Sequence, residues 1–249
     1  MWRSPVKANT GNKAFGLRKL LRFTYQNFNM EKPNKKTTDS PKYQILIARH
    51  AEKIDYLQYL PKRENRDYEV IVSNSGNPED QFPCDRTIVR ENLGREAGHY
   101  LNFMASEYEN MAPIVVFVQA GCFAHLNTIE PMLELFYGSP EFPFPMSFLG
   151  TKSVVGIEKV SRWSEAEHIL KTAWQDTNWN KPINGKPWVI GGGAQFYLKK
   201  EIVLKRTPEH YLRAIECARD PESKLAHVLE FHWPNMFDLS CLHQETTKA

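Results

Sequence analysis

The sequence predicts an α/β fold in which a mostly parallel central sheet is flanked by helices. Short apolar runs of strand length alternate with segments of helical spacing, and this order is typical of parallel sheets. Residues 43–48, 68–72 and 114–118 are the three clearest strands, because each is a short run rich in Val, Ile or Leu. With 249 residues and 41% hydrophobic content, the chain can bury a substantial core.

Weaker signals place the elements between these strands. Residues 52–60 are expected to be helical, and residues 88–89 to form a short third strand before a turn at Asn92. Asn and Gly tolerate the backbone angles that such a turn demands. A helix is predicted over about 97–110, because apolar side chains recur there at helical spacing.

The second half of the chain contains fewer clear signals. Prolines keep residues 140–145 out of helices and central strands. Residues 164–174 have the pattern of a short helix, and the glycines at 191–193 lead into a strand. Pro208 then begins a helix that reaches about residue 218, with Thr207 as its cap.

Residues 1–42 are predicted to be a basic extension and linker, and residues 43–249 a single domain. The extension contains ten of the 32 Lys and Arg residues but two of the 29 Asp and Glu residues. The rest of the chain is therefore mildly acidic, which argues against a nucleic-acid partner. Residues 14–28 can form a basic amphipathic helix that lies on an anionic membrane; the alternative is a helix packed on the domain or a loose tail.

Several features predict a cytoplasmic protein. No apolar run approaches the roughly 18 residues that a transmembrane helix needs. The N-terminus lacks the apolar segment of a secretory signal, and no Asn-x-Ser/Thr acceptor site is present. The four cysteines are scattered without metal-site spacing, as expected of free thiols in a reducing compartment.

Polar residues follow the predicted strands at the point where each strand ends. Arg49-His50, Ser73-Asn74 and the stretch 119–122 all stand in such positions. Because the carboxyl ends of parallel strands meet at one edge of a sheet, and ligands bind there, we expect these residues to converge on one crevice.

The stretch 92–101 couples a tight turn to the start of a helix. Arg95 and Glu96 stand side by side there, where free backbone N–H groups attract anions and the helix dipole favours a carboxylate. A rigid Arg/Glu pair in this position suits the binding of a sugar hydroxyl or a phosphate. The alternative is a structural ion pair behind the turn.

Familiar motifs of nucleotide hydrolases, dinucleotide-binding proteins, esterases and zinc proteases are absent from the sequence. Glu230 is the best acid–base candidate, because it lies in an apolar run where desolvation would raise the pKa of a carboxyl group. The alternative is an ordinary glutamate on a helix face. His232 is a candidate metal ligand or phosphate contact, although a lone histidine is more often neither.

Three segments together resemble an uncharacterised family, a domain of unknown function that occurs in fungi, algae, bacteria and algal viruses. They are ILIARHAE at 45–52 with Asp55; Asn92-x-Gly94-Arg95-Glu96 with Tyr100-Leu101 and then VFVQ at 116–119; and GAQF at 193–196 with a helix start at 208–211 and LExxW at 229–233. The Asn-x-Gly-Arg-Glu element also resembles one in glycan-building transferases of the rhamnan-synthesis type. The resemblance implies a glycosyltransferase type A fold, with a Rossmann-like nucleotide-sugar half at 43–137 and an acceptor half at 138–249.

This resemblance implies a glycosyltransferase that moves a sugar from a nucleotide-sugar to a hydroxyl of a glycan or glycoprotein. The donor would be a UDP-sugar, with UDP-xylose suggested by the viral relatives, whose setting implies the host cytoplasm. The donor would be held by Ala48, Arg49, Asn74, Arg95, Glu96 and Gln119. The acceptor side would be formed by Gly192, Gly193, Gln195, Phe196 and Trp233. Glu230 would be the base of an inverting transfer.

Metal-dependent members of the type A fold carry Asp-x-Asp after the central strand, where this chain has no carboxylate over residues 119–125. A manganese or magnesium ion would then have fewer protein ligands, with His232 as a candidate, or basic side chains would neutralise the diphosphate. The missing motif favours an alternative function, a catalytically inactive glycan-binding protein of the same fold. A small-molecule hydrolase that uses Glu230 and His232 is a third hypothesis.

Overall fold

The computed structural model describes residues 40–126, 129–149, 152–155, 188–191, 194–219, 229, 233–234 and 236–237. Several predictions therefore lie outside the described residues: the helices at 14–28 and 164–174, Gly192, Gly193, Glu230 and His232.

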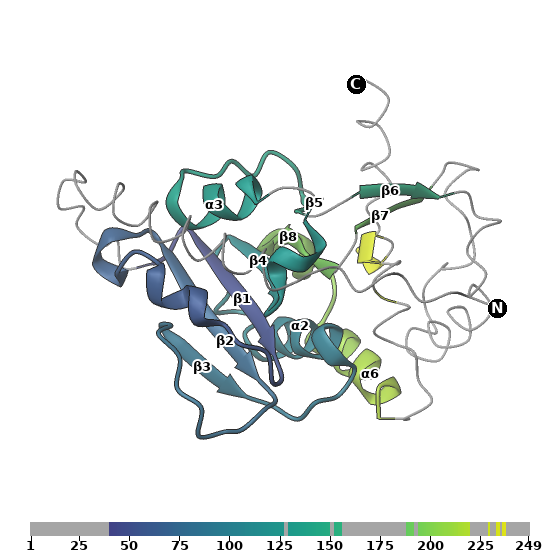
Figure 1. The fold of residues 1–249 in the computed structure, drawn as a ribbon. Helices are drawn as coiled ribbons and strands as arrows, with labels where there is room; N and C mark the ends of the chain where they lie inside the picture. Colours follow the sequence, from purple (N-terminus) through teal and green to yellow (C-terminus); the bar gives the residue numbers. More distant parts are fainter. Residues whose placement is uncertain are drawn as a thin grey trace, which may run out of the picture.

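A six-stranded sheet forms the centre of the fold (Figure 1). Its strands lie in the order β3-β2-β1-β4-β8-β5. Their bounds are β1 (Tyr43–Arg49), β2 (Tyr68–Asn74), β3 (Arg86–Val89), β4 (Ile114–Gln119), β5 (Met146–Phe148) and β8 (Phe196–Lys199). The first four strands are parallel, whereas β8 runs antiparallel to its neighbours β4 and β5. The prediction of an α/β fold with a mostly parallel sheet is confirmed.

A second, two-stranded sheet pairs β6 (Lys152–Val155) with β7 (Trp188–Gly191) in antiparallel fashion. Gly191, the first residue of the predicted glycine run, is the last residue of β7. The chain then returns to the central sheet as β8, so residues from the second half of the chain contribute two strands to the same sheet as β1–β4.

Alternate side chains of the central strands enter two hydrophobic clusters, one on each face of the sheet. In β1, Ile45 and Ile47 pack on one face and Leu46 packs on the other. The neighbouring strands β2 and β4 continue this alternation, and the side chains involved are fully buried. A sheet that is covered on both faces requires apolar residues at every position, which explains the continuous apolar runs in the sequence.

Helices cover both faces of this sheet (Figure 1). On the face of Leu46, α2 (Arg95–Ser106) packs against α6 (Pro208–Cys217) and contributes several buried apolar side chains. The other face is covered by the 3-10 helix η1 (Asp55–Tyr59) and by α3 (Glu130–Tyr137). The remaining short helices are η2 (Arg63–Asn65), η3 (Cys122–His125) and α5 (Lys200–Val203).

Three predicted helices differ from the observed ones in detail. α2 begins at Arg95, before the predicted start, because Gly94 adopts a φ of 69° and turns the chain directly into the helix. The helix expected over 52–60 is reduced to η1, since the Glu52 carboxylate accepts hydrogen bonds from the backbone of residues 50 and 51 and holds them in a loop. Thr207 precedes α6 as predicted but forms no side-chain cap hydrogen bond.

Candidate functional site

The ends of the strands meet at one edge of the sheet, as the sequence predicts. Parallel pairing places Arg49 opposite Asn74, and Ala48 opposite both Ser73 and Gln119. The antiparallel β8 begins at this edge, since Phe196 pairs with Phe117 near the end of β4. The chain builds β2 and β3 on one side of β1 and then returns to β4 on the other side. The edge therefore contains the strand-order reversal at which ligands of open α/β sheets bind.

Arg49 connects the loops that follow β1 and β2. Its Nη1 donates to Asn74 Oδ1 at 2.7 Å, its Nη2 lies 2.8 Å from Asp80 Oδ2, and its Nε donates to the Glu52 carbonyl at 3.0 Å. The guanidinium also stacks on the ring of Phe82. Each guanidinium nitrogen thus has a partner within the chain. This geometry gives Arg49 a positioning role, and direct contact with a nucleotide stays a prediction.

Asn74 is fully buried, and both polar atoms of its side-chain amide form hydrogen bonds. Its Oδ1 accepts hydrogen bonds from Arg49 and from the Gly76 backbone, and its Nδ2 donates to the Asn77 carbonyl. Gly76 passes so close to the His50 carbonyl that a Cβ would overlap its oxygen. The loops after β1 and β2 are therefore locked together, and they present a fixed backbone to the edge of the sheet.

Replacing Arg49 by Lys is expected to lower the free energy of unfolding by about 2 kcal/mol. The single ammonium group of a lysine cannot reproduce the contacts that the three guanidinium nitrogens make with Asn74, Asp80 and the Glu52 carbonyl. Urea unfolding monitored by tryptophan fluorescence would measure this loss. Arg219→Lys is the matched control, since Arg219 is 53% exposed and its pair with Glu216 lies on the surface. An equal, small effect in both variants would contradict the positioning role of Arg49.

The loop after β1 also holds a carboxylate against successive backbone N–H groups. Glu52 Oε2 accepts from the N–H of His50 at 2.8 Å and from that of Ala51 at 3.1 Å. Partial burial raises the pKa of Glu52, but hydrogen bonds from these N–H groups and its own N–H outweigh that effect and lower the pKa below its usual value. Glu52 therefore stays ionised and fixes the shape of the loop.

The start of α2 lies at the same edge, because the helix follows the parallel strand β3. Gly94 and Arg95 both have left-handed backbone angles, with φ values of 69° and 54°. A non-glycine residue in this region is strained, and such residues cluster at functional sites. Arg95 Nε lies 3.9 Å from Glu96 Oε2, and the Arg95 side chain is 65% exposed. The Arg/Glu pair that the sequence predicts is thus present as a long contact of an exposed arginine, and its rigidity and its role in ligand binding stay predictions.

The structure adds a buried histidine that the sequence analysis missed. His99, in the second turn of α2, lies between two serine hydroxyls from the end of β2: its Nδ1 is 2.7 Å from Ser73 Oγ, and its Nε2 is 3.2 Å from Ser75 Oγ. Ser75 Oγ in turn lies 3.4 Å from Nδ1 of His50. Helical spacing alone could have placed His99 beside Tyr100 and Phe103 but gives no information on its contacts with β2.

The stability of the fold is expected to fall in mild acid because of His99. Burial, assisted by the Arg90 guanidinium, lowers the pKa of His99 from 6.5 to about 4. Between these two values the unfolded chain binds a proton that the folded chain does not, so stability is complete above pH 6.5 and is lost as the pH falls toward 4. Between pH 7 and pH 5 the loss from this group is about 2 kcal/mol.

Urea unfolding at pH 7 and at pH 5 would test this dependence. His99→Gln should reduce the difference between the two free energies of unfolding. The pKa of His210 is also lowered to about 4, mainly by burial, so His210→Gln should reduce the difference as well, and the double variant should reduce it further. If His99→Gln leaves the pH difference unchanged, folding does not lower the pKa of His99.

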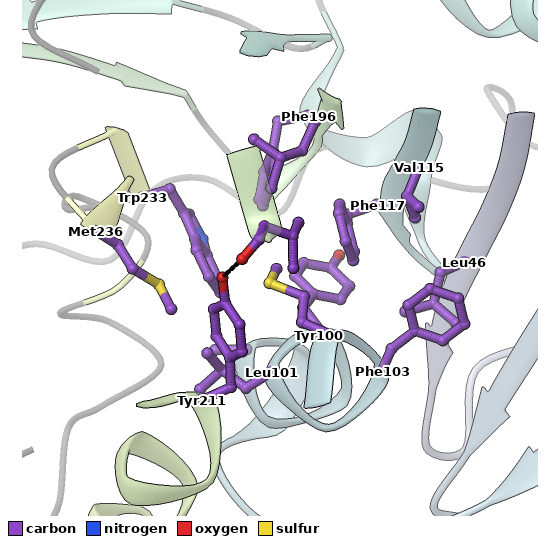
Figure 2. Packing of buried hydrophobic residues seen from close by; sticks show 14 of the residues in the cluster. Leu46, Tyr100, Leu101, Phe103, Val115, Phe117, Phe196, Tyr211, Trp233 and Met236 are labelled. Atoms are coloured by element: carbon purple, nitrogen blue, oxygen red, sulfur yellow. Dashed lines mark hydrogen bonds between the residues drawn. The ribbon is translucent and has the colours of Figure 1, made fainter. Parts of the chain in front are cut away.

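Several buried polar atoms near the ends of β4 and β8 have no hydrogen-bond partner. They are Tyr100 Oη, Gln119 Nε2, Gln195 Oε1 and Trp233 Nε1. Tyr100 and Trp233 lie in the same aromatic cluster (Figure 2). Three of these residues, Gln119, Gln195 and Trp233, are predicted site residues, and Ala194, next to Gln195, adopts a strained φ of 47°. Their free atoms distinguish this part of the edge from the fully paired loops after β1 and β2.

The structure thus brings the predicted donor residues and the described acceptor residues to one edge of the sheet. Phe196 is fully buried and packs its ring on Phe117 and Trp233. Within the described ranges, no three His, Cys, Asp or Glu side chains are grouped so that they could hold a metal ion. In that same part of the chain, none of the helices has the length and apolar character needed to cross a membrane.

No family model matches the chain, and no curated protein or solved structure is significantly similar to it. The class that the structure defines is therefore an α/β protein with a mixed, mostly parallel six-stranded sheet, compatible with a Rossmann-like fold.

Proposed function

We propose that the chain is a glycosyltransferase of type A-like fold that moves a sugar from a UDP-sugar to a glycan hydroxyl. The observation that carries the proposal is the edge between β1 and β4, where the strand order reverses and buried polar atoms lack partners. Open α/β sheets bind nucleotides and related ligands at such an edge. The resemblance of the Asn-x-Gly-Arg-Glu element to glycan-building transferases supports the choice of a nucleotide-sugar.

In this proposal the donor lies across the ends of β1 and β4. Ala48 and Gln119 are paired across these two strands, beside the strand-order reversal. Glu96 and the exposed Arg95 approach from the first turn of α2, where backbone N–H groups attract a diphosphate. Arg49 and Asn74 shape the adjoining loops rather than supply free groups.

The reaction we propose is an in-line attack of the acceptor hydroxyl on the anomeric carbon of the donor. Glu230 accepts the proton of that hydroxyl, the bond between the anomeric carbon and the diphosphate oxygen breaks, and UDP leaves with the electron pair. Because attack and departure take place on opposite faces, the product has the inverted configuration. Gln195, Phe196 and Trp233 border the acceptor.

A thermal-shift screen tests the proposal. The protein would be heated with UDP, UDP-glucose, UDP-galactose and UDP-xylose, each with and without manganese. A ligand at 100 times its Kd stabilises the fold by about 2.7 kcal/mol, which corresponds to roughly 5–10 °C for a chain of this size. Gln119→Ala should reduce the shift. Lys42→Ala, in which the altered residue lies at the opposite end of β1, should not.

The outcome of the screen decides the proposal when it is combined with an assay of UDP release. Release that depends on an added glycan acceptor indicates transfer, and release without an acceptor indicates hydrolysis. If no nucleotide or nucleotide-sugar raises the melting temperature at millimolar concentration, the transferase proposal fails. The manganese arm reports whether a divalent cation takes part.

A glycan-binding protein without catalysis is the second candidate. It is favoured by the pairing of Arg49, because this cation at the end of β1 is already paired with Asp80 and is not available to a diphosphate. This candidate predicts binding of neutral oligosaccharides with no affinity for UDP or its sugars. A glycan array followed by calorimetry with UDP would separate the two functions.

A further inference from the structure

His50 is the first residue after β1, the strand that borders the strand-order reversal. Its backbone is fixed on two sides. The His50 N–H donates to Glu52 Oε2 at 2.8 Å, and the His50 carbonyl packs so closely on Gly76 that no Cβ fits between them. The His50 side chain is nevertheless exposed. The fold therefore presents an accessible imidazole at this edge of the sheet from a rigid backbone.

The hydrogen bonds of His50 determine which ring nitrogen is free. Nδ1 lies 3.1 Å from the Ser75 carbonyl oxygen and 3.4 Å from Ser75 Oγ. Because a carbonyl oxygen can only accept, Nδ1 carries a hydrogen and donates it. The other nitrogen, Nε2, has no hydrogen-bond partner among the residues that the structure describes. The loop thus holds the ring through Nδ1 and leaves Nε2 to a ligand.

The neighbouring His99 differs from His50 in both respects. Its side chain is buried, and each of its ring nitrogens lies within hydrogen-bond distance of a serine hydroxyl. Ser75 Oγ, which contacts both rings, donates to the Arg49 carbonyl at 3.3 Å and so can accept from either imidazole. His99 therefore supports the loop, and His50 is the histidine of this pair with an atom available for binding.

A free imidazole nitrogen at the end of β1 suits a phosphate group. In the protonated ring both nitrogens donate, and Nε2 then offers a phosphate oxygen a hydrogen bond assisted by positive charge. Arg49, the preceding residue, is already paired with Asp80 at 2.8 Å. His50 can therefore supply at this strand end the cationic donor that Arg49 cannot.

We propose that Nε2 of His50 binds the diphosphate of the nucleotide-sugar. This inference rests on the proposed function and deepens it, because it names a side chain that neutralises the diphosphate in a chain without an Asp-x-Asp motif over residues 119–125. When the bond between the anomeric carbon and the diphosphate oxygen breaks, the electron pair stays on that oxygen. The hydrogen bond from Nε2 stabilises the charge that develops there, and no proton is transferred. Free pyrophosphate has the same chemistry, and the experiment distinguishes the two ligands.

Acylation with diethyl pyrocarbonate tests the inference on the wild-type protein. The reagent acylates accessible imidazole nitrogens, and mass spectrometry of the digested protein gives the rate at each histidine. We expect His50 to react and the buried His99 to stay unmodified. At about ten times its Kd, UDP leaves about one site in eleven free, so UDP should slow the acylation of His50 roughly tenfold. Uridine, which has no phosphate, should not slow it.

Calorimetry with His50→Asn measures the contribution of Nε2. The asparagine amide can still donate to the Ser75 carbonyl, so the melting temperature should change little. Because asparagine has no atom in the place of Nε2, UDP should bind roughly 10- to 100-fold more weakly, the loss expected for a hydrogen bond to a charged group. Uridine binding should not change. Lys42→Ala is the matched control, since it removes a cation at the opposite end of β1 and should bind UDP as wild type does.

Failure of this inference and failure of the proposed function give different results. If UDP binds wild type but leaves the acylation of His50 unchanged, or binds His50→Asn as tightly as wild type, the role of His50 is overturned while the nucleotide site stands. If UDP does not bind, but pyrophosphate slows the acylation of His50 and binds His50→Asn more weakly, the phosphate site stands and the transferase is overturned. If UDP does not bind and pyrophosphate leaves His50 unaffected, both are overturned.

Discussion

Glu230→Gln is expected to lower the rate of sugar transfer by about 10²–10⁴-fold, the range that general-base catalysis contributes. The amide has nearly the shape of the carboxylic acid but cannot take the proton of the acceptor hydroxyl. Binding of the donor should change little, because the proposed role of Glu230 is on the acceptor. The measurement is acceptor-dependent UDP release at saturating UDP-sugar, together with a thermal shift that reports donor binding.

Glu141→Gln is the matched control for this variant, because Glu141 is exposed and far in sequence from the proposed base. It should transfer sugar at the wild-type rate. A Glu230→Gln protein that melts normally and transfers sugar at full rate would remove Glu230 from the role of base. A variant that loses donor binding as well as transfer would indicate that Glu230 belongs to the donor side of the site.

The arrangement of the first four strands could be predicted from the sequence, because short stretches of the sequence identify each strand and the helices between them. Apolar runs identify β1, β2 and β4, and the helices between them imply parallel pairing. Parallel pairing in turn brings Arg49, Asn74 and Gln119 to one edge without any knowledge of long-range contacts. The approximate position of the site therefore follows from the order of the elements alone.

The antiparallel β8 and the partners of the site residues could not be predicted in this way. β8 pairs with β4 across some eighty residues of chain, and nothing in its four residues specifies that partner. The pairing of Arg49 with Asp80 and the position of His99 between two serines depend equally on tertiary structure. The sequence shows that a side chain is polar. Whether its donors and acceptors already have hydrogen-bond partners depends on the residues that surround it in the folded protein.

That distinction changes how the predicted site residues are interpreted. Arg49 and Asn74 were expected to bind the nucleotide, yet their polar groups bind one another. Buried polar atoms without a partner lie instead on other residues, among them Gln119, Gln195, Trp233 and Tyr100. The hydrogen bond between Arg49 and Asn74 stabilises the loops, whereas the unpaired polar atoms lower the stability of the fold. Such a cost is typical of binding sites, where local stability is sacrificed for function.

Gly98→Ala is expected to lower the free energy of unfolding by about 3 kcal/mol, although alanine is the better helix former by about 1 kcal/mol. Gly98 is the fourth residue of α2, where the loop before the helix folds back on it. A Cβ at this position would overlap the carbonyl oxygen of Leu93, and its carbonyl carbon would be 2.7 Å away. Both atoms belong to the backbone and cannot rotate away, so the loop itself must move.

That loop leads directly to Arg95 and Glu96, so Gly98→Ala should weaken UDP-sugar binding as well as stability. Urea unfolding and calorimetry on the same preparation would measure both effects. Gly121→Ala is the matched control for stability, because a Cβ there meets nothing within 4 Å. Its free energy of unfolding should be close to that of wild type. If Gly98→Ala is instead as stable as wild type, the loop is free to move. In that case the close approach of Leu93 to α2 does not hold the proposed donor site in place.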